Sequence, residues 1–160
     1  LLKEWLEAGY EVGIMSESGC PGIADPGSVL VAKAQEIGAL VNPMVGPSSI
    51  FLALMASGFS GQNFRFAGYL PIKDPERSKV MHQMEEWCRQ RDETQIFIET
   101  PYRNGKMVED ILATCRPQTK LCIAANLTCE GEYAKTRTVK EWKGNVPDLS
   151  KIPCIFLLYK

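Results

Sequence analysis

The residues best placed to do chemistry lie in turns that follow short apolar segments, and the longest of these turns is Ser16–Gly27. It is rich in glycine and proline and follows the apolar residues at 12–15. In an open parallel sheet, ligands bind beyond the carboxyl ends of the strands. Glycine lets a ligand approach the backbone, and proline orders the turn before the ligand binds. Because strand-to-helix connections usually run about 2–6 residues, a turn of this length favours ligand binding over a plain connection.

The Asp25-Pro26 pair near the end of this turn bears on whether Asp25 acts in catalysis. Aspartate is typical of a helix N-cap and proline of the first helical position. We therefore expect Asp25 to cap the helix that follows.

A second strand-to-helix turn, Val45–Ser49, carries two serines. Their hydroxyls, with the N–H groups at the start of a helix, are suited to a carboxylate or a ribose hydroxyl. Serine is also a common helix cap, and taken alone this turn favours the simpler role.

Two polar segments in the second half of the chain also follow predicted strands. Glu99 ends one strand and precedes Thr100–Asn104, and Asn126–Thr128 follows another. Parallel strands deliver such residues to one crevice. A surface ion pair of Glu99 with Arg103, and ordinary turn chemistry at 126–128, explain the same residues about as well, so both interpretations stay open.

The composition disfavours several other kinds of site. The six cysteines form no C-x-x-C pair and His82 is the only histidine, so we expect no metal centre and no Ser–His–Asp triad. The G-x-G-x-x-G and P-loop phosphate motifs are absent, as is the G-x-S-x-G nucleophile elbow.

The net charge and the hydropathy of the chain limit the kinds of partner that we expect for it. The net charge of -1 gives no generally basic surface for nucleic acid, but it leaves room for a local patch. No apolar run reaches the roughly 20 residues of a membrane helix. We see no secretory signal and expect reduced cysteines in a cytoplasm.

Apolar spacing predicts alternating strands and helices in the first 71 residues, which favours a mostly parallel sheet with helices on its faces. The expected strands are 12–15, 40–44 and 64–70, and the expected helices are 2–8, 30–37 and 50–56. The composition then breaks at Pro71–Pro75, where we place a boundary between domains 1–71 and 72–160.

The second domain is also expected to alternate. Asp74 and Pro75 are typical of a helix start. The expected strands are 94–99, 120–125 and 154–159, a further helix is expected at 107–115, and 132–142 fits either a strand or a short helix.

Taken together, these turns resemble the motifs of the tetrapyrrole methylase superfamily, the class III S-adenosylmethionine-dependent methyltransferases. The resemblance is strongest to the branch that includes ribosomal RNA small-subunit methyltransferase I. That branch carries S-D-A-G-T-P-x-I-x-D-P-G, P-x-x-G-P-[SC]-[SA]-[AI], G-[FY]-L-P, Y-E-[SA]-P-H-R and R-E-L-T. The matching segments are Ser16–Gly27, Pro43–Ile50, Gly68–Pro71, Ile98–Arg103 and Ala125–Thr128.

The sequence departs from the family pattern at three points. Tyr102 stands where the family has histidine, and Asn126 stands where it has an acid. The family's opening strand, with its P-T-P-I-G-N-L loop, is absent, and the chain begins without methionine. We therefore expect an N-terminally truncated member whose cofactor pocket is incomplete.

The resemblance implies a two-domain α/β fold, with a parallel-sheet N-terminal part that lacks its first strand and a mixed-sheet C-terminal domain. It also implies that S-adenosyl-L-methionine binds in the crevice between the domains, and that members are commonly homodimers. The implied cofactor contacts are Ser18, Gly19, Cys20 and Ile23 at the methionine end, Ser48 and Ser49 in the second turn, and Glu99 and Leu127 near the adenine.

The implied function is 2′-O-ribose methylation of small-subunit ribosomal RNA, with the RNA or the small subunit as partner and no membrane. In that reaction Glu99 is the candidate base for the ribose hydroxyl, and Arg103 is the candidate contact for an RNA phosphate. Two alternatives stay open: a methylase of tetrapyrrole-type small molecules with the same cofactor site, and a non-catalytic module that binds the cofactor or RNA. The D-P-G form of the first turn favours the RNA branch, because the tetrapyrrole branches carry G-D-P.

Overall fold

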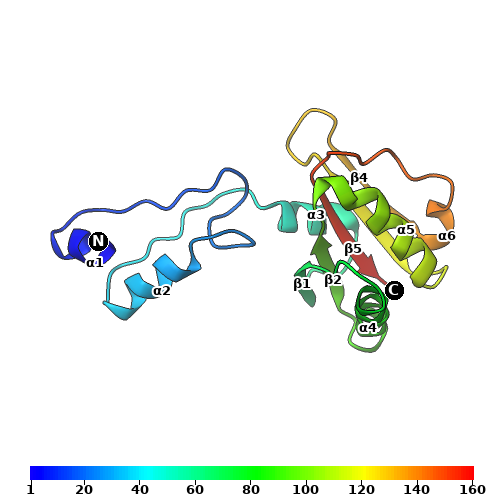
Figure 1. The fold of residues 1–160 in the computed structure, drawn as a ribbon, viewed down its shortest axis with the longest axis horizontal. Helices are drawn as coiled ribbons and strands as arrows, with labels where there is room; N and C mark the ends of the chain where they lie inside the picture. Colours follow the sequence, from blue (N-terminus) through cyan, green and yellow to red (C-terminus); the bar gives the residue numbers. More distant parts are fainter. The chain divides into compact units, whose positions relative to one another are not determined.

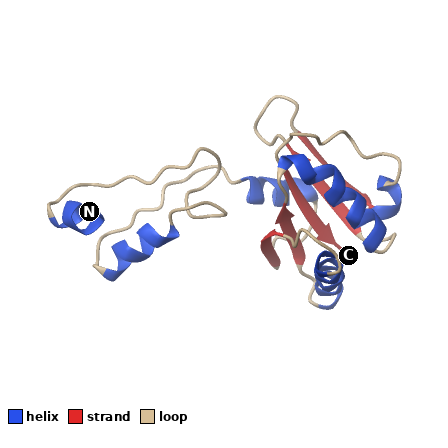
Figure 2. Cartoon of the chain, viewed as in Figure 1, coloured by secondary structure: helices blue, strands red, loops and turns tan.

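The computed structural model describes all 160 residues and has an α/β fold (Figures 1 and 2). The chain divides into two compact units, residues 1–48 and residues 49–160. Each unit is described by itself.

Residues 49–160 form one mixed five-stranded sheet, which confirms the mixed sheet expected for the C-terminal part. The strands are β1 (Phe64–Tyr69), β2 (Thr94–Ile98), β3 (Lys120–Ala125), β4 (Tyr133–Thr138) and β5 (Cys154–Tyr159). Their order across the sheet is β1-β2-β5-β3-β4. The β1–β2 pair is parallel, and the other three pairs are antiparallel.

Helices cover both faces of this sheet, because each buried strand is apolar on both faces. The helices are α3 (Ser49–Ser57), α4 (Glu76–Gln90), α5 (Asn104–Thr114) and α6 (Val139–Trp142), with a short 3-10 turn at Pro101–Arg103. Leu121 and Ile123 of β3 pack into the larger core under α4, α5 and α6, whereas Cys122 and Ala124 pack against α3. This alternation is the period of two expected of a strand.

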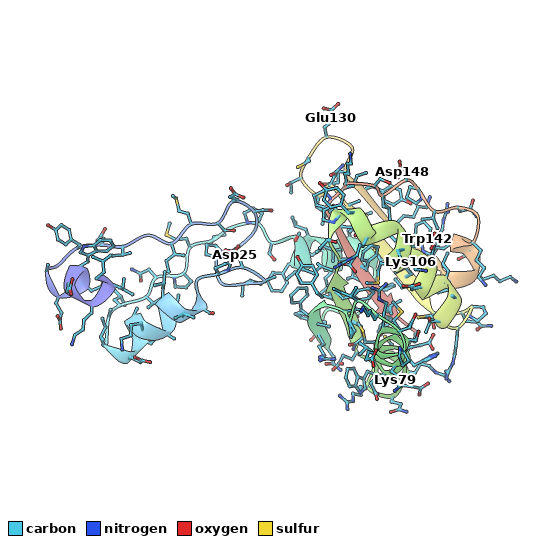
Figure 3. The ribbon with its side chains drawn as sticks, in the orientation of Figure 1. Asp25, Lys79, Lys106, Glu130, Trp142 and Asp148 are labelled. Atoms are coloured by element: carbon cyan, nitrogen blue, oxygen red, sulfur yellow. The ribbon has the colours of Figure 1, made fainter.

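The segment 132–142, which fitted either a strand or a short helix, contains both. β4 ends at Thr138, whose hydroxyl accepts a hydrogen bond from the Glu141 N–H, while the Glu141 carboxylate accepts one from the Thr138 N–H. This capping box starts α6 and places Trp142 in the core, where its indole N–H donates to the Leu121 carbonyl at 2.8 Å (Figure 3).

Residues 1–48 contain α1 (Leu2–Glu7) and α2 (Ser28–Glu36) but no strand. Of the three strands expected in residues 1–71, only 64–70 is formed, as β1, and it pairs in parallel with β2. The segments 11–16 and 40–47 are irregular, and their N–H groups donate no backbone hydrogen bond. None of residues 1–47 is buried. A strand is stabilised by its pairing and by burial of one face, and these segments have neither.

The expected N-cap at Asp25 is also wrong. Gly27 is the N-cap of α2, with a φ of 136° that suits glycine, and no side chain caps this helix. Asp25 lies two residues too early in the chain for that role.

At the Pro71–Pro75 break, α4 begins one residue later than expected, at Glu76. Asp74 nevertheless accepts hydrogen bonds from the N–H and the hydroxyl of Ser78. The domain boundary placed here stays a prediction. The structure adds that β1, on its N-terminal side, pairs with β2 in the sheet of the C-terminal unit.

The helices are all too short or too polar to cross a membrane.

We expect hydrogen exchange to separate the irregular segments from the sheet. The amides of 12–15 and 40–44 should exchange at nearly the rate of an unfolded chain, because they donate no backbone hydrogen bond. The amides of β3 and β5, which have strands on both sides, should exchange slowly. Mass spectrometry of peptic peptides measures both, and slow exchange at 12–15 and 40–44 would show that these segments do pair as strands.

Candidate functional site

The carboxyl ends of three strands meet at one edge of the sheet. β1 runs parallel to β2, and both β2 and β3 run antiparallel to β5, which lies between them. The residues that follow β1, β2 and β3 therefore share this edge, as the sequence predicts for Glu99 and Asn126. Ligands commonly bind at such an edge in α/β folds.

Glu99 is a buried polar group at this edge, with a side chain only 1% exposed. The alternation of β2 points Phe97 toward α4 and α5, and Glu99 continues that face. Its Oε1 atom accepts hydrogen bonds from the Thr100 N–H at 2.7 Å and from the Arg103 guanidinium at 2.7 and 3.1 Å. The ion pair that the sequence offered as an alternative is therefore present.

The charge of Glu99 is set by two opposing effects. Burial raises the pKa of the carboxyl group, but the hydrogen bonds from Arg103 and Thr100, with the positive charges of Arg103 and Arg77, lower it by more. The net pKa lies below the ordinary value of 4.5. Glu99 is therefore a carboxylate at neutral pH.

One atom of this carboxylate, Oε2, is buried and has no hydrogen-bond partner. A buried carboxylate oxygen without a donor is costly. Next to Glu99 lies a shallow pocket lined by Tyr69, Leu70, Pro71, Ile72, Thr100 and Arg103. The pocket and the unpartnered Glu99 oxygen therefore lie at the same edge, although Glu99 itself does not line the pocket.

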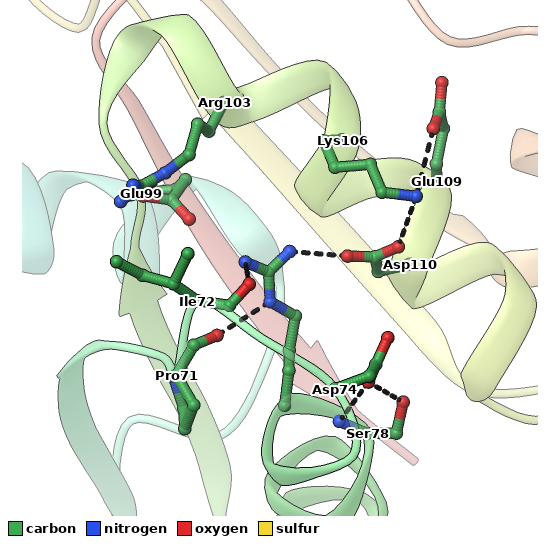
Figure 4. Close-up of polar contacts among 10 residues, drawn as sticks. Pro71, Ile72, Asp74, Ser78, Glu99, Arg103, Lys106, Glu109 and Asp110 are labelled. Carbon is green, nitrogen blue, oxygen red and sulfur yellow. Dashed lines mark hydrogen bonds and ion pairs between the residues drawn. The ribbon is translucent and has the colours of Figure 1, made fainter.

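Arg77, which the sequence analysis missed, holds the wall of this pocket. It lies on α4 and is 3% exposed. Its guanidinium donates to the Pro71 and Ile72 carbonyls and pairs with Asp110 of α5 (Figure 4). The helical spacing could have predicted its burial, because Arg77 lies four residues before the buried Met81 and so on the same face of the helix.

The structure separates the two C-terminal residues expected at the adenine. Leu127 packs with the cluster on the α3 face of the sheet, whereas Glu99 lies on the α4–α5 face. Asn126 and Thr128 have left-handed φ angles of 49° and 68°, and the Asn126 N–H donates to the Pro153 carbonyl at 3.1 Å. The edge is therefore shared, but its two faces carry different candidate residues.

In residues 1–48 the two predicted turns lie side by side. The Cys20 thiol donates weakly to the Gly46 and Pro47 carbonyls, with sulfur–oxygen distances of 3.6 and 3.4 Å. Ser18 and Ile23 of the first turn are exposed, Ile23 at 53%. Ser18, Gly19, Cys20, Ile23 and Ser48 thus belong to one unit, while Ser49, Glu99, Arg103 and Leu127 belong to the other. The assignment of these residues to a cofactor site stays a prediction.

Replacing Arg77 with methionine should destabilise the protein by about 3 kcal/mol. The carbonyls of Pro71 and Ile72 and the carboxylate of Asp110 would then lack their buried partner. Urea unfolding measures the loss. The matched control is Lys106→Met, which removes the other cation of Asp110 but is 63% exposed and should cost far less. Equal losses in the two variants would contradict a special role for Arg77.

The pKa of Glu99 gives a pH dependence with a definite sign. Because its folded pKa is depressed, Glu99 stabilises the protein above pH 4.5, and this contribution is lost as the pH falls through the folded pKa. The stability difference between wild type and Glu99→Gln should be constant from pH 7 to about 5 and shrink below about 4.5. Thermal unfolding across this range measures it.

The control is Glu130→Gln, in the exposed loop between β3 and β4 (Figure 3). Its stability should follow that of the wild type at every pH. A difference for Glu99→Gln that is the same at pH 7 and pH 3 would show that the Glu99 charge contributes nothing.

Comparison with known proteins finds relatives of this chain by sequence. No protein-family model matches the chain. Three relatives carry the name ribosomal RNA small subunit methyltransferase I. The Neisseria meningitidis protein (serogroup A) is 34% identical over 137 residues, which cover 86% of this chain and 45% of the relative. The Haemophilus influenzae protein is 32% identical over 154 residues, which cover 94% of this chain and 53% of the relative. The Bacillus subtilis protein is 37% identical over 138 residues, which cover 86% of this chain and 46% of the relative. The chain spans about half the length of these relatives.

Solved structures give the same fold. The methyltransferase CobJ superposes with a TM-score of 0.64 at 17% identity, covering 98% of this chain and 67% of that one. Uroporphyrin-III-C-methyltransferase from Thermus thermophilus superposes with a TM-score of 0.51 at 19% identity, covering 89% and 61%. These matches identify the chain as a homologue of the ribosomal RNA small subunit methyltransferase I proteins, with the fold of the tetrapyrrole methylases.

Proposed function

We propose that the chain is part of an S-adenosylmethionine-dependent methyltransferase that acts on small-subunit ribosomal RNA. The similarity to relatives of that name carries the proposal, since each match covers most of this chain. The pocket at the sheet edge, with the buried carboxylate of Glu99 beside it, supports it.

The residues present fit an adenosyl cofactor. Glu99 Oε2 is a buried acceptor without a donor, and the amino and hydroxyl groups of an adenosyl moiety are donors. Leu127 offers an apolar contact on the other face of the same edge. We propose that the methionine end of the cofactor binds at the two turns of the N-terminal part. The contacts would come from Ser18, Gly19, Cys20 and Ile23 in the turn 16–27 and from Ser48 and Ser49 in the turn 45–49.

The cofactor, when bound, supplies an activated methyl group on a sulfonium. The protein then has to align the acceptor with that methyl group and exclude water, and alignment alone supplies several kcal/mol. The ordered turns suit this task, because Cys20 ties the first turn to the Gly46-Pro47 backbone before any ligand binds.

We propose the ribose 2′-hydroxyl as acceptor, with Glu99 as the candidate base. Its lowered pKa makes it a weak base, so we give Glu99 the cofactor contact as its main role and proton removal as the role to test. Arg103 is 37% exposed and uses Nε and Nη2 on Glu99, which leaves Nη1 for an RNA phosphate.

The test is transfer of labelled methyl from S-adenosylmethionine to small ribosomal subunits that lack the modification. We expect Glu99→Gln to raise the KM for the cofactor more than it lowers kcat, because the carboxylate contacts the cofactor in both ground and transition states. A large fall in kcat alone would make Glu99 the base instead. Glu109→Gln is the control, because Glu109 is 73% exposed on α5 and is not a candidate site residue.

The labelled product decides the acceptor. A methyl group on the ribose 2′-oxygen should make the adjacent phosphodiester resistant to alkali, whereas a methylated base leaves it sensitive. Transfer to a tetrapyrrole precursor and none to RNA would favour the small-molecule alternative. Cofactor binding without any transfer would favour the non-catalytic module.

On the basis of a ribosomal substrate, we propose that the reaction takes place in the cytoplasm. We also propose a homodimer, on the family resemblance and on the exposure of Phe51 and Met55 on α3, at 52% and 79%. Sedimentation of the protein at micromolar concentration tests this.

A further inference from the structure

Two arginines stack on one tryptophan at the end of the sheet opposite Glu99. Arg65 is the second residue of β1 and lies on the same face as Ala67, which packs under α4. Its guanidinium carbon is 4.6 Å from the centre of the Trp87 ring. Arg91 follows the last turn of α4, one turn beyond Trp87, and its guanidinium carbon is 5.0 Å from the same ring.

Neither guanidinium has an acidic partner. Arg65 and Arg91 make no ion pair and no side-chain hydrogen bond, unlike Arg77, Arg103 and Arg116, which all pair with carboxylates. The nearby acids are bonded elsewhere. Asp92 pairs with Lys160 and accepts from Tyr159, Glu86 pairs with Arg116, and Glu93 accepts from Gln95.

Stacking on an aromatic ring fixes a guanidinium while leaving its in-plane N–H groups free. Such a fork matches the oxygens of a phosphate, and little side-chain entropy remains to be lost on binding. Because both guanidinium carbons lie within about 5 Å of one ring centre, they lie within about 10 Å of each other. Two neighbouring phosphates of one strand can therefore contact both arginines.

We propose that Arg65 and Arg91, held on Trp87, form a phosphate-binding pair for the backbone of single-stranded RNA. The phosphate chemistry comes from the two unpaired guanidinium groups, and only the choice of RNA as its source rests on the proposed function. The pair lies at the amino end of β1, whereas the pocket lies at its carboxyl end. It would thus hold a part of the RNA remote from the reacting nucleotide.

The test is the affinity of the whole chain for a fluorescein-labelled single-stranded RNA, measured by anisotropy over a range of salt without cofactor. The double variant Arg65→Gln/Arg91→Gln should bind about tenfold more weakly at low salt, and the slope of log affinity against log salt should become shallower by about 1.4, roughly 0.7 for each lost phosphate contact. The variant Arg65→Lys/Arg91→Lys should keep most of that slope, because it keeps both charges.

The matched control is Arg137→Gln. Arg137 lies on the other edge strand, β4, and its guanidinium carbon is 5.1 Å from the Trp142 ring centre, so it is a stacked arginine without a second arginine on the same ring. It should leave affinity and slope unchanged. Circular dichroism melts confirm that each variant is folded.

Three outcomes overturn the proposal: unchanged affinity and slope in the folded double Gln variant, an equal loss in Arg137→Gln, or equally tight, arginine-dependent binding of a poly-glutamate peptide, which would indicate an acidic protein partner. The proposed function fails separately. If small subunits accept no methyl group while RNA binding still depends on Arg65 and Arg91, the phosphate site stands and the reaction assignment falls.

Discussion

One buried guanidinium connects three elements of the C-terminal unit. Arg77 sits on α4, donates to the backbone that follows β1, and pairs with Asp110 of α5. A buried arginine is tolerated only when such partners replace its water. Because Pro71 and Ile72 line the pocket, the position of that wall depends on Arg77.

The charge of Arg77 also reaches the carboxylate at the same edge. Burial alone raises the pKa of Glu99, whereas the hydrogen bonds from Arg103 and Thr100 and the charges of Arg103 and Arg77 lower it by more. Two arginines from different elements, Arg103 and Arg77, thus offset the cost of burying the Glu99 carboxylate. The Oε2 atom has no hydrogen-bond partner, so this compensation is incomplete.

The arginines near the two ends of β1 differ in their partners. At the carboxyl end, Arg77 and Arg103 each pair with a carboxylate, so their positive charges are neutralised there. At the amino end Arg65 and Arg91 have only the Trp87 ring, which fixes them without neutralising them. A protein with a net charge of -1 can therefore still present a local positive site.

Much of the C-terminal unit could be predicted from local pattern. The strands 94–99, 120–125 and 154–159 and the helix after Pro75 were expected within about a residue or two of their observed bounds, because apolar periodicity and proline act over a few residues. The placement of Glu99 at a strand end followed from the same local signals, whereas its ion pair with Arg103 was one of two interpretations that the sequence left open.

In residues 49–160 the sequence by itself thus determined most of the segments that form elements, and the polar residue Glu99 that follows β2. Only the tertiary structure decided that 12–15 and 40–44 are not strands, because pairing needs a neighbouring backbone that no local pattern encodes. It also decided that Glu99 and Leu127 lie on opposite faces of one edge, that Arg77 holds the pocket wall, and that Arg65 and Arg91 meet on Trp87. The Arg77–Asp110 and Arg65–Trp87 contacts join residues far apart in the chain, so they exist only after the sheet and its helices have assembled.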